Sequence, residues 1–215
     1  MTDRSFLLAS MLCTKLCHDI TGPVGAINNG VEFMSEEEGK IPDEIMDLVA
    51  SSATEAVARL QFYRRAYGRI TKDNAASLTE QYELTKQFFA ASKIDVDWPD
   101  SHTDMSGIEI NQQMAQLLLN MVIIVQGTIM REGVLKVRIE EDASTGIAFT
   151  VESSGGAVKE NIEVSEILKG DESVDIDPKT AQSYLTAELA KQSAMRLVIV
   201  SSEDSYRLMA QKTMA

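Results

Sequence analysis

The stretch Cys17-His18-Asp19-Ile20-Thr21-Gly22-Pro23 places a histidine beside an acid, with a proline five residues after the histidine. Apolar side chains recur every three or four residues through it and on both sides: Leu8, Leu12, Leu16, Ile20, Val24, Ile27, Val31 and Met34. This spacing predicts one continuous helix, which we expect to cover residues 5–36. Pro23 removes one helical hydrogen bond and is predicted to bend the helix one turn beyond His18.

The imidazole of His18 is predicted to face solvent. His18 lies two residues after Leu16, which is about 200° round a helix, so it points away from the apolar stripe. The residues that share its outward face are small or polar: Lys15, Thr21, Gly22, Gly25 and Asn29. Another protein could therefore approach the imidazole closely and bind these residues. The alternative interpretation of a lone histidine on a helix is an ordinary solvated surface residue.

Residues 16–32 carry a family resemblance. They read Leu-Cys-His-Asp-x-x-x-Pro-Val-Gly-Ala-Ile-x-Asn-Gly-Val-Glu, which resembles the H-box of two-component histidine kinases and, more closely, the ChpT-type bacterial histidine phosphotransferases. The resemblance implies that His18 is a phosphoacceptor and that Asp19 is the assisting acid–base. It also implies a receiver domain of a hybrid histidine kinase as the upstream partner, and response regulators downstream. The Mg²⁺ for transfer can come from the partner receiver domain, so we expect this chain to bind no cofactor and no metal.

Composition excludes several classes of function. The 215 residues are 44% hydrophobic and 25% charged, which is typical of a globular protein. A net charge of -13 argues against nucleic-acid binding. The sequence has no apolar run long enough to span a membrane and no signal peptide pattern, so we expect a cytoplasmic protein. Cys13 and Cys17 lie one helical turn apart and are predicted to be small packing residues rather than a disulfide or metal site.

A second helix is expected from Pro42 to about residue 67, followed by a stop at Gly68. Two long helices joined by a short turn form an antiparallel hairpin, and one hairpin cannot cover both of its apolar stripes. We therefore predict that residues 1–72 are a dimerisation and phosphotransfer domain that forms a four-helix bundle in a homodimer. The second helix carries three basic residues: Arg59, Arg64 and Arg65. They form either a solvated face that balances nearby acids or a docking surface for an acidic partner.

Residues 71–77 have the composition of a linker, and residues 77–215 are predicted to form a second domain. The expected helices are 77–91, 111–128, 162–168 and 178–193, and the expected strands are 93–98, 134–140, 147–153, 196–201 and 206–211. Helices that alternate with a mixed sheet indicate an α/β sandwich. The complete chain is thus predicted to be α+β, with a helical hairpin followed by this sandwich.

The order of these elements resembles a degenerate histidine-kinase ATPase (Bergerat) domain. Asn120 lies where the kinases have a Mg²⁺-binding asparagine, but the next helical turn offers no polar companion. Residues 152–157 replace the glycine-rich motif of the kinases and lack its adenine-binding aspartate. We therefore expect phosphotransferase activity without ATPase or autokinase activity. The alternatives are an ATP-dependent histidine kinase fragment and a non-catalytic dimeric scaffold for receiver domains.

Overall fold

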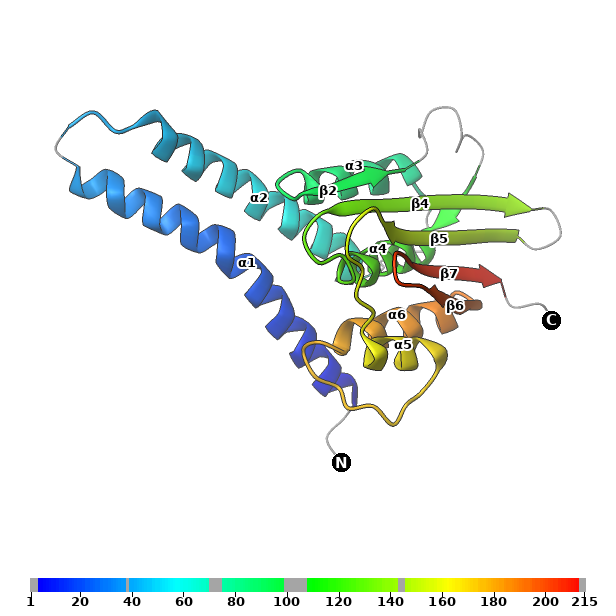
Figure 1. Ribbon diagram of the computed structural model, residues 1–215. Coiled ribbons are helices and arrows are strands. Elements are labelled where there is room, and N and C mark those ends of the chain that lie inside the picture. The colour runs from blue at the N-terminus through cyan, green and yellow to red at the C-terminus, as the bar shows by residue number, and fades with distance from the viewer. Residues whose placement is uncertain (1–3, 38, 70–74, 99–107, 143–145, 213–215) are drawn as a thin grey trace.

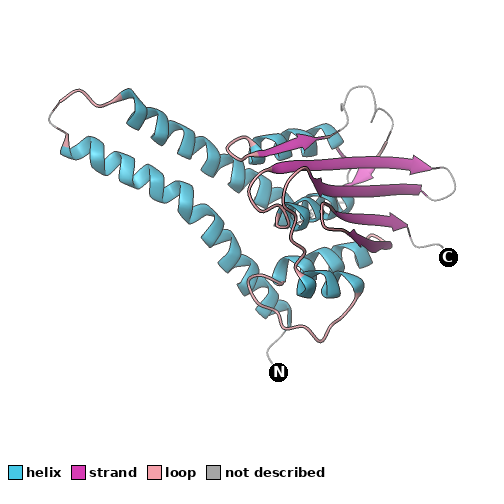
Figure 2. Cartoon of the chain, viewed as in Figure 1, coloured by secondary structure: helices cyan, strands magenta, loops and turns pink. Residues whose placement is uncertain are grey.

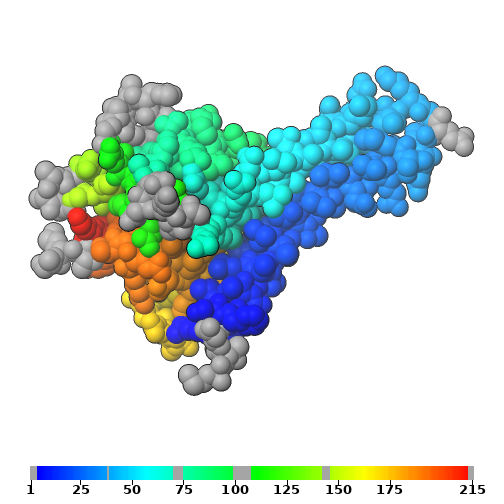
Figure 3. Space-filling model, turned by 180° about the vertical axis from the view of Figure 1, so that it is seen from behind, coloured from blue at the N-terminus to red at the C-terminus, as the bar shows by residue number. Residues whose placement is uncertain are grey.

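The computed structural model describes residues 4–37, 39–69, 75–98, 108–142 and 146–212. A long helical hairpin comes first and projects from an α/β part that contains the rest of the chain (Figure 1). The space-filling view shows the hairpin as an arm that extends beyond the α/β part (Figure 3). The predicted order of a hairpin followed by an α/β sandwich is confirmed.

The hairpin consists of α1 (Arg4–Glu36) and α2 (Asp43–Tyr67). The two helices approach closely at Gly30, where a Cβ atom would lie 2.4 Å from Cγ2 of Val49. Pro23 lies inside α1, which changes direction near its middle (Figure 1). Because proline has no N–H, the carbonyl of Asp19 lacks its helical donor, and Nη1 of Arg59 lies 3.5 Å from this oxygen instead.

The α/β part has two layers (Figure 2). Its helices are α3 (Leu78–Phe89), α4 (Gln112–Gln126), α5 (Ile162–Lys169) and α6 (Ala181–Gln192). Its main sheet has the order β2 (Ile94–Asp97), β4 (Gly133–Asp142), β5 (Gly146–Ser154), β7 (Tyr206–Lys212) and β6 (Met195–Ser201). The pair β2–β4 is parallel and the other pairs are antiparallel, so the sheet is mixed, as predicted. Alternate residues of β5 and β7 are buried, because only one face of these strands packs against the helices.

Local capping explains where several helices begin. Ser77 accepts a hydrogen bond from the backbone N–H of Glu80, and Asn111 accepts one from that of Met114, so these two residues are the N-caps of α3 and α4. The predicted start of the last helix at residue 178 is wrong. Asp177 accepts hydrogen bonds from the backbone N–H groups of Lys179 and Thr180 in a turn, and α6 begins at Ala181.

Two short strands were not predicted from the sequence. β1 (Ala75–Ala76) and β3 (Ile110–Asn111) pair antiparallel, and a two-residue strand carries no readable alternation. Of the predicted linker at residues 71–77, residues 71–74 lie outside the described residues and Ala75–Ala76 form β1, so the domain boundary stays a prediction.

One hydrophobic core joins the hairpin to the α/β part. Phe62, Tyr63 and Ala66 of α2 belong to the same buried cluster as the side chains of α4 and the sheet. Leu16 and Ile20 of α1 pack against this cluster. At the base of the hairpin the chain's own α/β part therefore covers the apolar stripes, and the predicted homodimer stays a prediction.

Farther from this core, apolar side chains of the hairpin remain exposed. They are Val24, Val31 and Phe33 on α1, and Met46, Leu48, Val57 and Leu60 on α2, each at least 42% exposed. Cys13 and Cys17 are also exposed and unbridged, so the interpretation of both as packing residues is wrong within a single chain. No helix among the described residues is long and apolar enough to cross a membrane.

Candidate functional site

The His18 side chain is 88% exposed on α1, so its predicted outward orientation is confirmed. Two glycines follow it on the same face, and a Cβ at Gly22 or Gly25 would meet no atom within 4 Å. Asn29 is exposed farther along this face, and the hydroxyl of Thr21 is exposed and donates to the carbonyl of Cys17 at 2.7 Å. No large side chain of these residues therefore projects beside the imidazole, which would allow another protein to approach it.

Asp19 is held in a network that the sequence did not reveal. Its side chain is only 18% exposed, and its Oδ2 lies 2.5 Å from the hydroxyl of Tyr63 and 3.0 Å from Nζ of Lys15. Its Oδ1 lies 3.3 Å from Nδ1 of His18. Asp19 thus points inward but still reaches the imidazole. Lys15 was predicted to be available to a partner, but it lies against Asp19 and is 26% exposed.

This network controls the ionisation of Asp19. Burial by itself raises the pKa of the carboxyl, but the hydrogen bond from Tyr63 and the charge and hydrogen bond of Lys15 lower it more. The pKa of Asp19 therefore lies below its ordinary value of 3.8, and the group is a carboxylate at neutral pH. Burial, followed by the hydrogen bond to Asp19, raises the pKa of Tyr63, so its hydroxyl remains a donor. The donor closest to the carboxylate comes from α2, which no motif around His18 indicates.

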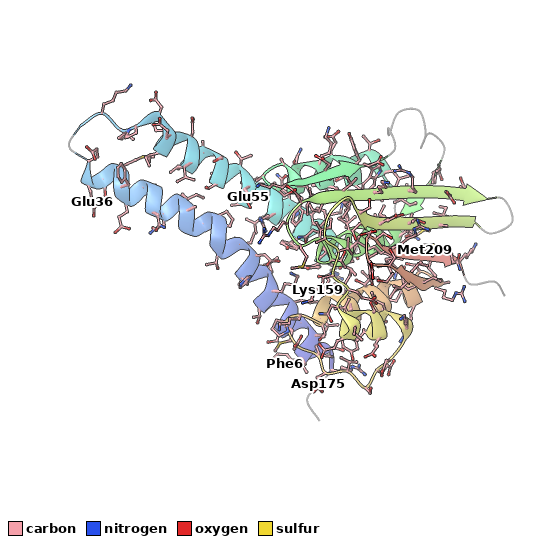
Figure 4. The ribbon with its side chains drawn as sticks, in the orientation of Figure 1. Phe6, Glu36, Glu55, Lys159, Asp175 and Met209 are labelled. Atoms are coloured by element: carbon pink, nitrogen blue, oxygen red, sulfur yellow. The ribbon has the colours of Figure 1, made fainter. Side chains whose placement is uncertain are left out.

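The three predicted arginines have different environments. Arg59 forms an ion pair with Glu55, which is labelled on α2 in Figure 4, and its Nη2 lies 2.7 Å from Oε1 of that residue. Arg65 forms an ion pair with Glu80 of α3. Arg64 is exposed and has no ion-pair partner among the described residues. Two of the three arginines are therefore used within the chain, and Arg64 is the one presented outward.

Asn120 and residues 152–157 are the two places where the sequence resembles kinase nucleotide motifs. Asn120 is completely buried, donates to the carbonyls of Ala66 and Gln116 at 2.8 and 2.7 Å, and accepts from Nε2 of Gln182 at 2.5 Å. Both ends of its amide are thus occupied by protein groups. Gly155 has a φ of 80°, and the backbone bends at Gly155 and Gly156 directly after β5. Within the described ranges, no group of three or more His, Cys, Asp or Glu residues could hold a metal ion.

Comparison with known proteins identifies the class. The histidine phosphotransferase C-terminal domain family matches residues 78–205, and the chain therefore belongs to the histidine phosphotransferases. These proteins act in two-component phosphorelays, and this chain is of the ChpT type. A relative is the protein phosphotransferase ChpT of Brucella abortus (strain 2308), which is 34% identical over 200 residues, 92% of each chain.

Solved structures agree with this class. A bacterial phosphotransferase is similar with a TM-score of 0.80 and 30% identity, over 98% of each chain. The histidine kinase AdeS of Acinetobacter baumannii is similar with a TM-score of 0.50 and 9% identity, over 92% of this chain and 98% of the kinase chain. The second likeness concerns the fold alone. It shows that the hairpin and the α/β part are arranged in the histidine kinase manner.

Proposed function

We propose that His18 accepts a phosphoryl group from a receiver-domain aspartate and passes it to the aspartate of a response regulator, without using ATP. The observation that carries this proposal is the environment of His18. Its side chain is 88% exposed, and its Nδ1 lies 3.3 Å from Oδ1 of Asp19. The other oxygen of that carboxylate is bound by the hydroxyl of Tyr63. The other ring nitrogen, Nε2, is then free to meet an incoming phosphoryl group.

The proposed chemistry needs only a positioned nucleophile on this side. The lone pair of Nε2 attacks the phosphorus, a P–N bond forms, and the bond from phosphorus to the aspartate oxygen breaks, so that the carboxylate leaves. Transfer to the second receiver is the reverse reaction. Both steps depend on positioning and on neutralisation of the phosphoryl charge. We propose that the Mg²⁺ in the acidic pocket of the receiver supplies that neutralisation, and that Asp19 keeps the proton on Nδ1.

The environment of Asn120 supports transfer without ATP. Its amide would have to leave three protein partners to reach a nucleotide, and two of them, the carbonyl of Ala66 and Nε2 of Gln182, would be left buried without hydrogen bonds. The turn at Gly155 also lacks the adenine-binding aspartate of the kinases. We therefore propose that the α/β part does not bind ATP, and that a receiver domain of a hybrid histidine kinase is the phosphoryl donor.

The exposed apolar side chains support a homodimer. Val24 and Val31 lie seven residues apart on one face of α1, and Met46 and Val57 lie on one face of α2. In an antiparallel hairpin these two faces lie on the same side, while His18 is about 120° round the helix from Val24. A second hairpin could thus cover the apolar faces and leave the imidazole free. A dimeric four-helix bundle is the arrangement that we propose.

The test is transfer of radiolabel from a phosphorylated receiver to the full chain. Wild-type protein should acquire acid-labile phosphate, and His18→Ala and His18→Gln should acquire none, because an amide is a poor nucleophile. The sequence has one other histidine, His102, and His102→Ala is the control that should be labelled normally. Asp19→Asn should be labelled more slowly. Label on His18→Ala, or label that survives acid, would contradict the proposal.

The source of the label and the dependence on His18 separate the alternative functions. A kinase fragment would become labelled from radioactive ATP without any receiver. A scaffold would bind receivers and remain unlabelled, and its function would not depend on His18.

A further inference from the structure

We propose that Tyr63 is a positioning residue that fixes the carboxylate of Asp19 and thereby determines which nitrogen of His18 reacts. This inference rests on the proposed role of His18 as the phosphoacceptor. Tyr63 does not contact the imidazole itself. It acts through Asp19, from the other helix of the hairpin and from a position 44 residues later in the chain.

The two oxygens of Asp19 have different partners. Oδ2 accepts from the hydroxyl of Tyr63 at 2.5 Å and from Nζ of Lys15 at 3.0 Å. Oδ1 is left to face Nδ1 of His18 at 3.3 Å. An ionised carboxylate in this position is an acceptor only, so the ring nitrogen that it faces must carry the proton. The lone pair of the neutral imidazole is then on Nε2.

Tyr63 is better able than Lys15 to fix this geometry. Its residue is only 3% exposed, and its ring stacks on Tyr67 with centroids 5.3 Å apart and packs edge-on against Phe88 at 5.7 Å. Its hydroxyl is therefore held by the core that α2 shares with the α/β part. Lys15 is on the same helix as Asp19, one turn away, and has a long, partly exposed side chain with several rotatable bonds. The ammonium group of Lys15 neutralises the charge of the Asp19 carboxylate, whereas the buried Tyr63 hydroxyl fixes the direction in which this carboxylate points.

The surroundings also suggest that the hydroxyl can be removed without unfolding the protein. A cavity of about 310 Å³ is bordered by Lys15, Asp19, Arg59 and Tyr63. It is large enough to hold water, and its lining includes charged groups that can bind water. In Tyr63→Phe, water can therefore replace the lost donor to Oδ2. The phenyl ring remains, so the aromatic packing is preserved.

The chain provides a closely matched control. Tyr67 belongs to the same stacked pair, but its hydroxyl donates to Oε1 of Gln182 at 2.5 Å and does not contact Asp19. Tyr67→Phe removes one hydroxyl from the same aromatic cluster and leaves the carboxylate network unchanged. Any effect that is common to both variants reports on the cluster, and an effect confined to Tyr63→Phe reports on Asp19.

The first readout is the protonation pattern of the His18 ring in the full-length protein. Nitrogen-15 NMR distinguishes an imidazole with its proton on Nδ1 from one with its proton on Nε2. Wild-type and Tyr67→Phe proteins should hold the proton on Nδ1, and Tyr63→Phe should show a mixture of the two forms. This measurement needs no phosphoryl transfer, so it tests Tyr63 even if the proposed function fails.

The second readout is the rate of labelling from a phosphorylated receiver. Tyr63→Phe should be slower than wild type by about tenfold, the scale of one hydrogen bond to a charged group. In an Asp19→Asn background, Tyr63→Phe should have little further effect, because the oxygen that it positions is no longer charged. An unlabelled wild type would contradict the proposed function alone. A labelled Tyr63→Phe with wild-type rate and wild-type ring protonation, or equal slowing by Tyr67→Phe, would overturn the role of Tyr63.

Discussion

Replacement of Asn120 by leucine tests whether this residue stabilises the fold or binds a nucleotide. The leucine side chain branches at the same carbon atom and cannot hydrogen-bond. In the native protein the amide of Asn120 joins α4 to the last turn of α2 through the carbonyl of Ala66, and to α6 through Nε2 of Gln182. The carbonyl of Gln116 keeps its helical partner within α4. Asn120→Leu thus leaves two buried polar groups without partners, since carbonyls in a last helical turn have no helical donor.

The expected loss of stability follows from these two buried polar groups that lose their partners. Each buried polar group that loses its partner costs about 1–3 kcal/mol, so Asn120→Leu should lower the free energy of unfolding by about 2–6 kcal/mol. That is a large fraction of the roughly 5–15 kcal/mol that stabilises a typical domain. The assay is chemical denaturation. The control is Asn111→Ala on the same helix, which removes one capping bond to Met114 and should cost about 1 kcal/mol.

Two results would refute this reasoning. If Asn120→Leu cost no more than Asn111→Ala, the three hydrogen bonds of the buried amide would not hold the helices together. If Mg²⁺-ATP raised the melting temperature of the wild type but not that of Asn120→Leu, the side chain would be a nucleotide ligand. We expect Mg²⁺-ATP to change neither melting temperature.

Two further predictions concern the hairpin. Val57→Glu replaces an exposed apolar side chain by a charged one, so light scattering should show that this variant does not form the proposed dimer; an unchanged dimer would exclude this face from the interface. Gly30→Ala should cost about 1–3 kcal/mol in chemical denaturation, because its Cβ would meet Val49 at 2.4 Å. Gly22→Ala should instead stabilise by roughly 0.5–1 kcal/mol, because that Cβ meets nothing and alanine favours the helix; similar effects at both glycines would contradict the close approach of the helices.

Much of the fold could be predicted because its elements are long and strongly patterned. The stripe through Leu16 and Ile20 defines α1, and two alternating stretches of sequence define β4 and β5, which pair antiparallel. The exposure of His18 could also be predicted, because it follows from helical geometry relative to Leu16 alone. These features depend on neighbours within a few turns of the same element. The histidine kinase likeness of the α/β part was accessible from the order of elements for the same reason.

The rest depends on contacts between elements that are distant in the sequence. Tyr63 looked like one more member of an apolar stripe, and only the packing of α2 on α1 brings its hydroxyl to Asp19. Arg59 looked available to a partner, but it lies by the carbonyl that Pro23 deprives of a donor. The cysteines differ in the opposite direction, because they were expected to pack within the protein and are exposed in the single chain. Cys17 lies seven residues before Val24 on α1, a spacing that repeats the face which the proposed second hairpin would cover.

The α/β part can have a function in transfer without binding a nucleotide. At the start of α1, the guanidinium of Arg4 lies 4.8 Å from the ring centre of Tyr184 on α6, and it forms an ion pair with Glu172 in the connection before that helix. This end of α1 lies beside the α/β part, far from Glu36 at the tip of the hairpin (Figure 4). Together with the shared core around Tyr63, these contacts attach the α/β part to both helices of the hairpin.

That attachment fits a carrier better than a kinase. A kinase must bring the γ-phosphate of its own bound ATP to the histidine, which requires its nucleotide domain to move relative to the hairpin. A carrier receives its phosphoryl group from another protein, so it gains from a site that does not move. Because the buried ring of Tyr63 carries the hydroxyl that holds Asp19, the rigidity of the shared core extends to the carboxylate beside His18. In the proposed carrier, the α/β part therefore serves as the support that keeps the imidazole ready for each receiver.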